Sequence, residues 1–536
     1  MRRISNRLLI GTTSQSGDPF GVITQRLTRT GSQVTSYPRT DDVTVSQEND
    51  VKPFDALPGP KGHRAIPFLG TMFMMKPFTP YTVDTLGQML NNFHDKYGPI
   101  FRARMGRDWI VYVERLEDIQ KCFRSDGACP RRPLIMLHKI YQTRTGRPHS
   151  LTTLEGEAWR KLRTPLNHRM NRPSSATYYL PAQNEVADDF VNILRDSSLT
   201  PEQLRESFFR FAAESVGVVC FNRRLGFLSQ DLQSRAVSQK LLECFKTNLR
   251  CTGAAMMGKE FKYLFYEDAF YKTFKKATDH IMSYVTNYLN EALEEVKRRQ
   301  REGTWDENEP NLVLSLLAEP SLGVPDVLAV LEPLMTAGSD STASGLQMLL
   351  YNLSLHQDKQ ESLYRELQDH HLHQAEPLTP TLLAQLKYLA ATVKESLRLS
   401  FPLPSGVARI LPVDLVLGGY QIPKGTTVGI SSQRTAISDK YFREPRQFLP
   451  ERWLRNEEGQ RERSISGFAH LPFGFGPRNC IGRRFAEQEM YLVIAKIIRS
   501  FQVSLPEEYK SGQLETEFRP FVTPKRPFPF VFKPRQ

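Results

Sequence analysis

The sequence predicts one large, mainly α-helical domain with a minor β component. Amphipathic helical segments follow one another from Leu151 to Leu399. An alternation of apolar and polar residues is confined to the short stretch between Val407 and Val428. No linker-like composition or internal repeat interrupts the chain after residue 60. With 40% hydrophobic and 24% charged residues, the composition excludes disordered and collagen-like classes.

Residues 1–50 differ in composition from the rest of the chain. Their first 40 residues carry one acidic residue, Asp18, many Ser and Thr, and six arginines: Arg2, Arg3, Arg7, Arg26, Arg29 and Arg39. This composition is typical of an organellar transit peptide, and a disordered basic tail is the alternative. No apolar run is long enough to predict a transmembrane span. We therefore expect a mitochondrial transit peptide at 1–50 and a folded domain at 51–536.

The folded domain is predicted to begin at "LPGPKG", Leu57 to Gly62, because this density of Pro and Gly enters neither a helix nor a central strand. A short strand is expected from Trp109 to Val113. The glycines of "DLVLGGYQIPKG" predict a hairpin that turns at Gly418 and Gly419. A last helix is expected from about Arg483 to Phe501.

The six cysteines are scattered without a CxxC pair, which argues against a disulfide scaffold and a zinc finger. The net charge of +13 is compatible with nucleic acid, an anionic membrane surface or an acidic protein as partner. The basic residues are spread along the chain, and no nucleic-acid-binding module is present. A nucleic-acid partner is therefore not expected.

The stretch "FGFGPRNCIG" places Cys480 where that last helix is about to begin. A thiolate ligand needs positive charge, backbone donors and restricted solvent access. Arg478 supplies a cation, Phe473 shields the sulfur, and the following helix turns its positive end towards it. Gly474, Gly476 and Gly482 permit tight turns and the close approach of a flat cofactor. The alternative is a buried structural cysteine.

This spacing, FxxGxRxCxG, resembles the haem-binding signature of the cytochrome P450 superfamily. The resemblance implies a single P450-type domain at 51–536, with haem b between a long distal helix and the cysteine loop. It further implies that Cys480 is the metal ligand, as a thiolate that favours O–O cleavage. Arg478 would pair with a haem propionate, and Trp159, Arg163 and Arg409 resemble further propionate ligands.

Two further motifs agree with this resemblance. In "KESLR", Glu395 and Arg398 share a helical face, and the resemblance joins them with Arg452 of "FLPERW" into a buried network that supports the cysteine loop. Within a predicted helix from Pro325 to Leu355, Ala337 and Gly338 would open a notch beside the haem.

The same helix carries Asp340, Ser341 and Thr342, whose carboxyl and hydroxyl groups would deliver protons for O–O cleavage. The family usually has Thr where Ser341 stands. Serine keeps the hydroxyl but loses the β-branch that fixes the rotamer, so we expect looser coupling of electrons to product.

The branch of the family resembled is the mitochondrial one, which takes electrons from an adrenodoxin-like [2Fe–2S] ferredoxin and its reductase. Lys394, Arg483 and Arg484 are the candidate ferredoxin-binding residues, because acidic ferredoxins associate with a basic surface. Vertebrate steroidogenic members carry a second lysine where Ala390 stands, and Lys387 is a possible substitute.

The predicted activity is a monooxygenase reaction on a lipophilic, sterol-like substrate with O2, at the matrix side of the inner mitochondrial membrane. The stretch from Cys251 to Tyr266 mixes Met, Phe, Tyr and Lys and is a candidate for peripheral membrane contact, with core packing as the alternative. Two other functions remain open: a peroxide-rearranging haem enzyme and a non-catalytic haem sensor. The proton-delivering pair Asp340 and Ser341 argues against the first.

Overall fold

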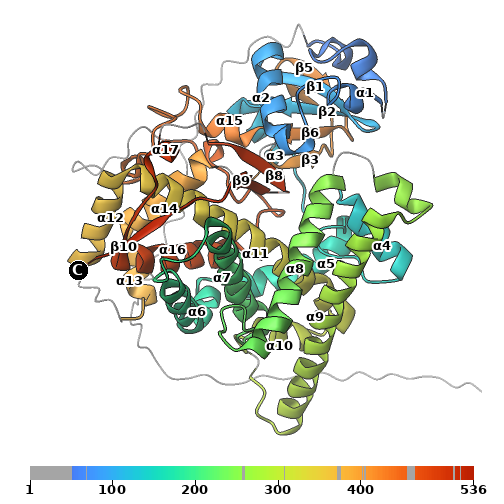
Figure 1. Cartoon of the computed structure of the whole chain (residues 1–536). Coiled ribbons are helices and arrows are strands. Elements are labelled where there is room, and N and C mark those ends of the chain that lie inside the picture. Colours follow the sequence, from blue (N-terminus) through green and yellow to red (C-terminus); the bar gives the residue numbers. More distant parts are fainter. Residues whose placement is uncertain are drawn as a thin grey trace, which may run out of the picture. The chain divides into compact units, whose positions relative to one another are not determined.

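A computed structural model describes residues 51–535, except residues 68, 256–259, 307, 371–375, 401–402, 404–405, 456–464, 511–513 and 520 (Figure 1). The predicted transit peptide, residues 1–50, lies outside the described residues. Val51–Gln536 forms one compact unit, in agreement with a single folded domain. No helix of the described part is long and apolar enough to cross a membrane.

Helices dominate this unit, as the sequence predicts. The α-helices are α1 Leu69–Phe73, α2 Leu86–Tyr97, α3 Leu116–Arg124, α4 Met136–Thr145, α5 Gly156–Met170, α6 Pro173–Ile193, α7 Pro201–Phe221, α8 Leu232–Ala255, α9 Ala269–Arg301, α10 Leu312–Leu317, α11 Val324–Leu355, α12 Gln357–Asp369, α13 Pro380–Gln385, α14 Lys387–Leu399, α15 Ser432–Ala436, α16 Arg483–Ser500 and α17 Glu507–Lys510.

The strands are short. They are β1 Ile100–Met105, β2 Asp108–Val113, β3 Ala408–Ile410, β4 Leu415–Leu417, β5 Tyr420–Ile422, β6 Thr427–Ile430, β7 Phe501–Ser504, β8 Thr516–Arg519, β9 Phe521–Pro524 and β10 Val531–Pro534. The largest sheet has the order β1-β2-β6-β3, in which β2 and β6 are parallel and the other pairs antiparallel.

The predicted hairpin is confirmed: β4 pairs with β5 in antiparallel register around Gly418 and Gly419. Both glycines have positive φ, 57° and 84°, where a side chain would strain the backbone. The predicted strand at Trp109–Val113 lies within β2. Its partner β1 and the helices α2 to α4 were not predicted from the sequence, although Phe101 and Ala103 alternate with Arg102 and Arg104 in the way expected of a half-buried strand.

The longest apolar helix, α11, runs through the hydrophobic core. It starts one residue before the predicted Pro325 and ends at the predicted Leu355. Pro325 suits the first turn, and the backbone N–H of Gly323 donates to Asp326 Oδ2 at 3.1 Å, which caps the helix start. Helices α7, α9 and α16 pack against α11. The core residues of these helices belong to one hydrophobic cluster, so α11 is held rigidly.

Candidate functional site

The cysteine loop folds as a tight turn directly before α16. The N–H of Cys480 donates to the carbonyl of Phe473 at 2.8 Å, and the N–H of Asn479 donates to the carbonyl of Gly476 at 3.0 Å. Gly474 and Gly476 have φ of 72° and 73°, a conformation that favours glycine. The two glycines therefore allow the loop to close and present Cys480 at the start of the helix.

The sulfur of Cys480 is accessible, although the surrounding protein raises the pKa of the thiol by burial. The two observations agree if the sulfur faces an internal space rather than the outer surface. The N–H of Gly482 bonds to the sulfur, and the positive charges of Arg163 and Arg483 favour the thiolate. A bound cation such as iron would shift the balance further towards the thiolate.

Arginines gather close to this loop. Burial and the neighbouring positive charges lower the pKa of Arg478 to about 9, and burial also lowers the pKa values of Arg132 and Arg163 to about 10. Repulsion from Arg409 contributes at both Arg478 and Arg132. Buried cations of one sign are stable only if an anion compensates them. Asp126 compensates Arg409, and the positive charge that remains in the cluster favours an anionic group.

The predicted residues Arg478 and Trp159 lie together in this cluster. The guanidinium of Arg478 sits 4.0 Å from the ring centroid of Trp159 and donates to the carbonyls of Pro130 and Leu154 at 2.9 and 3.0 Å. Its Nη1 is buried without a hydrogen-bond partner among the described residues. A carboxylate of the bound group would satisfy this orphaned donor.

Arg163 and Arg409 are partly engaged by the protein itself. Arg163 Nη2 donates at 2.7 Å to both the carbonyl and the side-chain oxygen of Asn479, next to Cys480. Arg409 pairs with buried Asp126 at 2.7 Å and donates to the carbonyl of Phe475 at 3.0 Å. Both arginines therefore hold the cysteine loop as well as contributing positive charge.

Arg132 is a member of the arginine cluster that the sequence analysis missed. Burial and the positive charge of Arg409 lower its pKa, which places it among the cations beside the loop. In the sequence, only the adjacent pair Arg131 and Arg132 before Pro133 could have pointed to this residue. The fold then brings the pair near Arg409.

Asp340, Ser341 and Thr342 point away from one another because successive helix positions differ by about 100°. Ser341 is half-buried on the same side of α11 as Ala337, and its hydroxyl donates to the carbonyl of Ala337 at 2.8 Å. Thr342 is buried instead against Glu489 of α16, to which its hydroxyl bonds. The structure therefore separates Thr342 from Ser341.

Gly338 does not simply open a notch on α11. A Cβ at this position would lie 2.9 Å from Cγ2 of Val216 on α7. The absence of a side chain at Gly338 is therefore needed for close packing of α11 against α7. The sequence pattern does not reveal this constraint.

Glu489 is a buried carboxyl group that the sequence analysis also missed. It lies nine residues after Cys480 on α16 and is 1% exposed. Gln183 donates to it at 3.1 Å, and the hydroxyls of Ser215 and Thr342 bond to it. Burial raises its pKa to about 8, which favours the protonated form at neutral pH. This carboxyl group joins α6, α7, α11 and α16.

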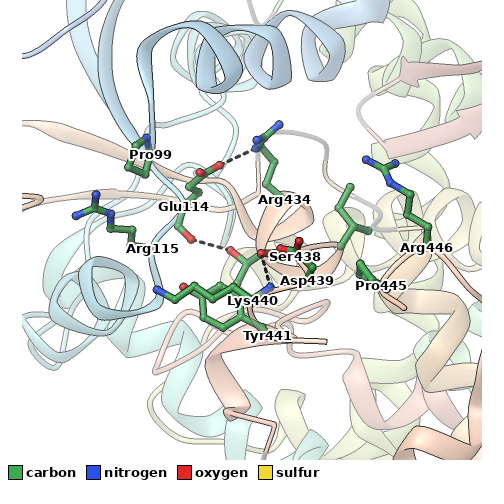
Figure 2. A pocket seen from close by; sticks show the side chains of 12 residues that line it. Pro99, Glu114, Arg115, Arg434, Ser438, Asp439, Lys440, Tyr441, Pro445 and Arg446 are labelled. Carbon is green, nitrogen blue, oxygen red and sulfur yellow. Dashed lines mark hydrogen bonds and ion pairs between the residues drawn. The ribbon is translucent and has the colours of Figure 1, made fainter. Parts of the chain in front are cut away.

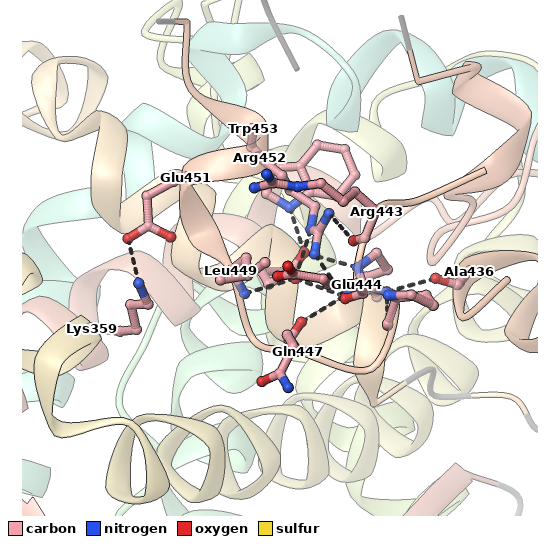
Figure 3. A network of polar contacts seen from close by, with 12 residues as sticks. Lys359, Ala436, Arg443, Glu444, Gln447, Leu449, Glu451, Arg452 and Trp453 are labelled. Carbon is pink, nitrogen blue, oxygen red and sulfur yellow. Dashed lines mark hydrogen bonds and ion pairs between the residues drawn. The ribbon is translucent and has the colours of Figure 1, made fainter. Parts of the chain in front are cut away.

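The predicted network of Glu395, Arg398 and Arg452 is present and fully buried (Figure 3). Arg398 makes two bonds to the Glu395 carboxylate at 2.7 and 2.9 Å, and Arg452 Nε donates to it at 2.9 Å. Trp453 Nε1 donates to Glu395 Oε2 at 2.8 Å, and its ring lies 5.0 Å from that of His470. The network thus reaches the segment that leads into the cysteine loop.

The remaining donors of the two arginines hold backbone carbonyls of the segment 436–447. Arg398 bonds to the carbonyls of Ala436, Pro445 and Gln447, and Arg452 bonds to those of Arg443 and Glu444 (Figure 3). Because five of its carbonyls accept from two buried arginines, this network fixes a segment that lies outside the α-helices and strands once α15 has ended at Ala436.

The candidate ferredoxin-binding residues are all exposed. Lys394 Nζ lies 4.2 Å from the ring centroid of Trp453. Arg483 pairs with Glu487 at 3.0 Å, and Arg484 Nε donates to the carbonyl of Asn171 at 2.6 Å. Lys394 therefore lies over the Glu395 network, whereas the two arginines begin the helix that follows Cys480.

A separate cavity of about 440 Å³ lies beside the main sheet and contains none of the predicted site residues (Figure 2). Its charges are largely paired: Arg434 donates to Glu114 Oε2 at 2.6 Å, and Thr435 Oγ1 donates to the carbonyl of Glu114 at 3.1 Å. We therefore place the functional site at the cysteine loop and not in this cavity.

Comparison with known proteins agrees with this geometry. Residues 60–532 match the family model "Cytochrome P450", and the chain belongs to the cytochrome P450 family. It is 28% identical to the mitochondrial 1,25-dihydroxyvitamin D(3) 24-hydroxylase of Mus musculus, covering 91% of each chain. It is 30% identical to the mitochondrial cholesterol side-chain cleavage enzyme of Capra hircus, covering 83% of this chain and 84% of the relative.

The fold also matches a solved structure, retinoic acid-bound cyanobacterial CYP120A1, with a TM-score of 0.69 and 21% identity over 90% of this chain and all of that one. The mainly α fold with minor β is therefore confirmed. The protein is an oxidoreductase that incorporates molecular oxygen, and its cofactor is haem bound through a cysteine thiolate.

Proposed function

We propose that the protein is a mitochondrial monooxygenase that hydroxylates a sterol-like substrate with electrons from an adrenodoxin-like [2Fe–2S] ferredoxin. Haem supplies the O2 chemistry when bound, and Cys480 is the residue proposed to hold its iron. The observation that carries this assignment is the juxtaposition of exposed Cys480 with buried arginines, among them Arg478, whose Nη1 lacks a partner among the described residues.

The arginine cluster is proposed to bind the haem propionates. Arg478 Nη1 is a donor open to a carboxylate, and Arg132 adds positive charge. Arg163 and Arg409 neutralise the anions from positions fixed by Asn479 and Asp126. Trp159 keeps the guanidinium of Arg478 in place through the stacking contact at 4.0 Å. The glycines of the loop leave room for the cofactor, and Phe473 lies on the side of Arg483, 5.5 Å from that guanidinium.

On the distal side, the residues proposed to move protons are Asp340 and Ser341. The Ser341 hydroxyl is oriented by its bond to Ala337, and the buried carboxyl of Asp340 supplies protons through water. Thr342 was a candidate for the same role. Its contact with Glu489 favours a different one, in which it positions α11 on α16.

The substrate class and the mitochondrial address are proposed from the relatives. The two relatives described above act on a vitamin D compound and on cholesterol, and both are mitochondrial by name. The arginine-rich segment 1–50 has the composition of a transit peptide. We propose the matrix side of the inner membrane as the site of action.

Peripheral membrane contact is supported by one end of the predicted stretch. Cys251 is buried in α8, but Leu264, Phe265 and Tyr266 expose 52, 86 and 53% of their surface. Three consecutive exposed apolar side chains after Lys262 suit a lipid surface. The proposed membrane contact is therefore limited to residues 264–266, whereas the sequence analysis considered the whole stretch from Cys251 to Tyr266.

The electron donor is tested by charge reversal at Lys394. If the exposed ammonium attracts an acidic ferredoxin, Lys394→Glu raises the apparent KM for the ferredoxin at least tenfold at low salt, with little change in kcat. Lys533→Glu, a reversal of an exposed lysine on β10, is the control. Equal KM values for both variants would contradict the assignment of Lys394.

Turnover separates the alternative functions. A screen of sterols for spin shifts of the haem protein, followed by oxygen consumption with a mitochondrial ferredoxin and its reductase, should give a hydroxylated product. Conversion of a lipid hydroperoxide without any electron donor would indicate the peroxide-rearranging enzyme instead. Ligand-induced spectral shifts without oxygen consumption would indicate the haem sensor.

A further inference from the structure

The cavity beside the main sheet contains none of the predicted site residues, but its lining is strongly charged (Figure 2). Its volume of about 440 Å³ lies in the range of small-molecule sites. Its wall is formed by residues that follow α2 and β2, by α15 and by the segment 437–446 after α15. The cationic lining residues are Arg115, Arg434, Lys440 and Arg446, and the anionic ones are Glu114 and Asp439.

Two of the four cations are paired within the protein. Arg434 pairs with Glu114 at 2.6 Å and with Asp95 at 2.9 Å, and Lys440 pairs with Glu117 at 3.6 Å. Asp95 and Glu117 lie outside the lining and expose 62 and 64% of their side chains, so water screens their charges. The lining itself therefore keeps an excess of positive charge.

Arg115 and Arg446 are the cations that remain. Neither guanidinium forms an ion pair or a hydrogen bond among the described residues, although the charge of Arg115 lowers the pKa of Asp118 on α3. Both side chains are exposed, and they come from opposite sides of the cavity (Figure 2). The cavity thus offers two guanidinium groups to a ligand.

The rest of the lining offers contacts to a carbon skeleton. Pro99, Ile437 and Pro445 contribute apolar side chains. The hydroxyl of Tyr441 accepts the N–H of Leu116 at 3.3 Å, which orients the tyrosine ring at the wall. Apolar surface combined with a few charged groups is typical of sites for small organic ions.

We propose that this cavity binds a small molecule that carries a phosphate monoester, with the phosphate held between Arg115 and Arg446. A phosphate monoester bears about 1.5–2 negative charges at pH 7, which complements the excess of cations in the lining. The planar guanidinium presents paired N–H donors that match phosphate oxygens. A carboxylate carries only one charge and is the weaker ligand. A free metabolite and a lipid headgroup both supply this chemistry.

The bound phosphate would hold a segment that the Glu395 network also holds. Arg446 follows Pro445, which lines the cavity and whose carbonyl accepts from Arg398 at 2.5 Å. A ligand that binds only the folded protein stabilises it increasingly as the ligand concentration rises. We therefore expect the phosphate compound to raise the melting temperature of the haem-loaded protein.

Arg115→Gln and Arg446→Gln test the site, because each removes one guanidinium that has no partner to lose and should leave folding intact. Arg124→Gln is the matched control, since Arg124 is an exposed arginine on α3 that does not line the cavity. The haem-loaded parent and variants are melted with increasing glycerol phosphate, and sodium chloride keeps the ionic strength constant. General stabilisation by phosphate salts acts on all four proteins alike, so only differences between them report the site.

We expect the melting temperatures of the parent and Arg124→Gln to rise to a plateau, and both cavity variants to need about tenfold more glycerol phosphate for half the rise. A second probe is co-sedimentation with phosphatidylcholine vesicles that contain phosphatidic acid. If only these vesicles bind the parent and Arg124→Gln better than the two cavity variants, the phosphate belongs to a lipid. If neither probe separates the cavity variants from Arg124→Gln, the site does not exist.

Discussion

At the residue scale, the most informative side chains are charged groups that the protein has removed from water. Glu395 carries a buried negative charge that two arginines and the N–H groups of Trp453 and Leu449 compensate. Glu489 is buried without such compensation, and burial raises its pKa to about 8, which favours the uncharged, protonated form. The two carboxyl groups are therefore sensitive to different changes. Glu395 is sensitive to the loss of an arginine partner, and Glu489 is sensitive to pH.

Replacing Arg452 by leucine should destabilise the protein by about 3–5 kcal/mol, because Glu395 would then keep a buried charge with only one guanidinium. The free energy of unfolding in urea and the haem content of the purified variant measure the effect. The control Arg365→Leu affects a side chain that is 70% exposed and 3.8 Å from Glu361, and should change stability by less than about 1 kcal/mol. Similar values for both variants would contradict a structural role of the network.

The pH dependence of stability should reveal Glu489. Its native pKa of about 8 exceeds the ordinary value of 4.5. Between these two pH values the native state therefore keeps a proton that the unfolded state has lost. Stability contributed by this group is complete below pH 4.5 and is lost as the pH rises towards 8, by at most about 1.4 kcal/mol per pH unit.

Glu489→Gln should remove that loss, so the melting temperatures of variant and parent should diverge in favour of the variant between pH 5 and 8. Glu508→Gln changes an exposed glutamate and should leave the parental pH profile unaltered. A Glu489→Gln profile that runs parallel to the parental one would show that this carboxyl group is ionised in the native protein.

At the scale of elements, the packing of α11 determines what its small residues do. Gly338→Ala should destabilise the protein by about 1–3 kcal/mol, since the added methyl group would meet Val216 at 2.9 Å. Val216→Ala in the same chain should recover most of that loss. Thermal unfolding of the single and double variants measures the coupling.

Gly345→Ala is the matched change on the same helix, because its nearest neighbour, Met490 Sδ, is 3.8 Å away. Here the gain in helix propensity should stabilise the protein by about 0.5–1 kcal/mol. If Gly338→Ala stabilised the protein equally, α7 would have room to move and Gly338 would be free to serve the site instead.

Sequence patterns predicted some elements well and others poorly, for physical reasons. The α11 helix and the Gly418–Gly419 hairpin have strong local signals, namely a long apolar run and a pair of glycines at a turn. Thr342 was grouped with Ser341 through the family resemblance, which has a second Thr or Ser at that place, and its contact with Glu489 comes from a distant segment that no local pattern predicts. The partners of Arg132 and Glu489 come from distant segments, so no local pattern could reveal them.

At the scale of the whole molecule, the described domain places three buried polar systems around the cysteine loop and the helix that follows it. Buried arginines lie beside the loop, the Glu395 network holds the segment before it, and Glu489 joins the helix after it to α11. The loop is therefore fixed from several sides before any cofactor binds. We expect such preorganisation to favour a single position of the sulfur relative to α11.

The central claim is that Cys480 is the thiolate ligand of the haem, and the carbon monoxide difference spectrum of the reduced protein tests it most directly. The parent and Cys220→Ser, which changes a cysteine buried on α7, should both show the band characteristic of thiolate-ligated haem. Cys480→Ser should lose that band, even where haem is retained. A thiolate-type band of parental intensity in Cys480→Ser would contradict the assignment and require another cysteine as the ligand.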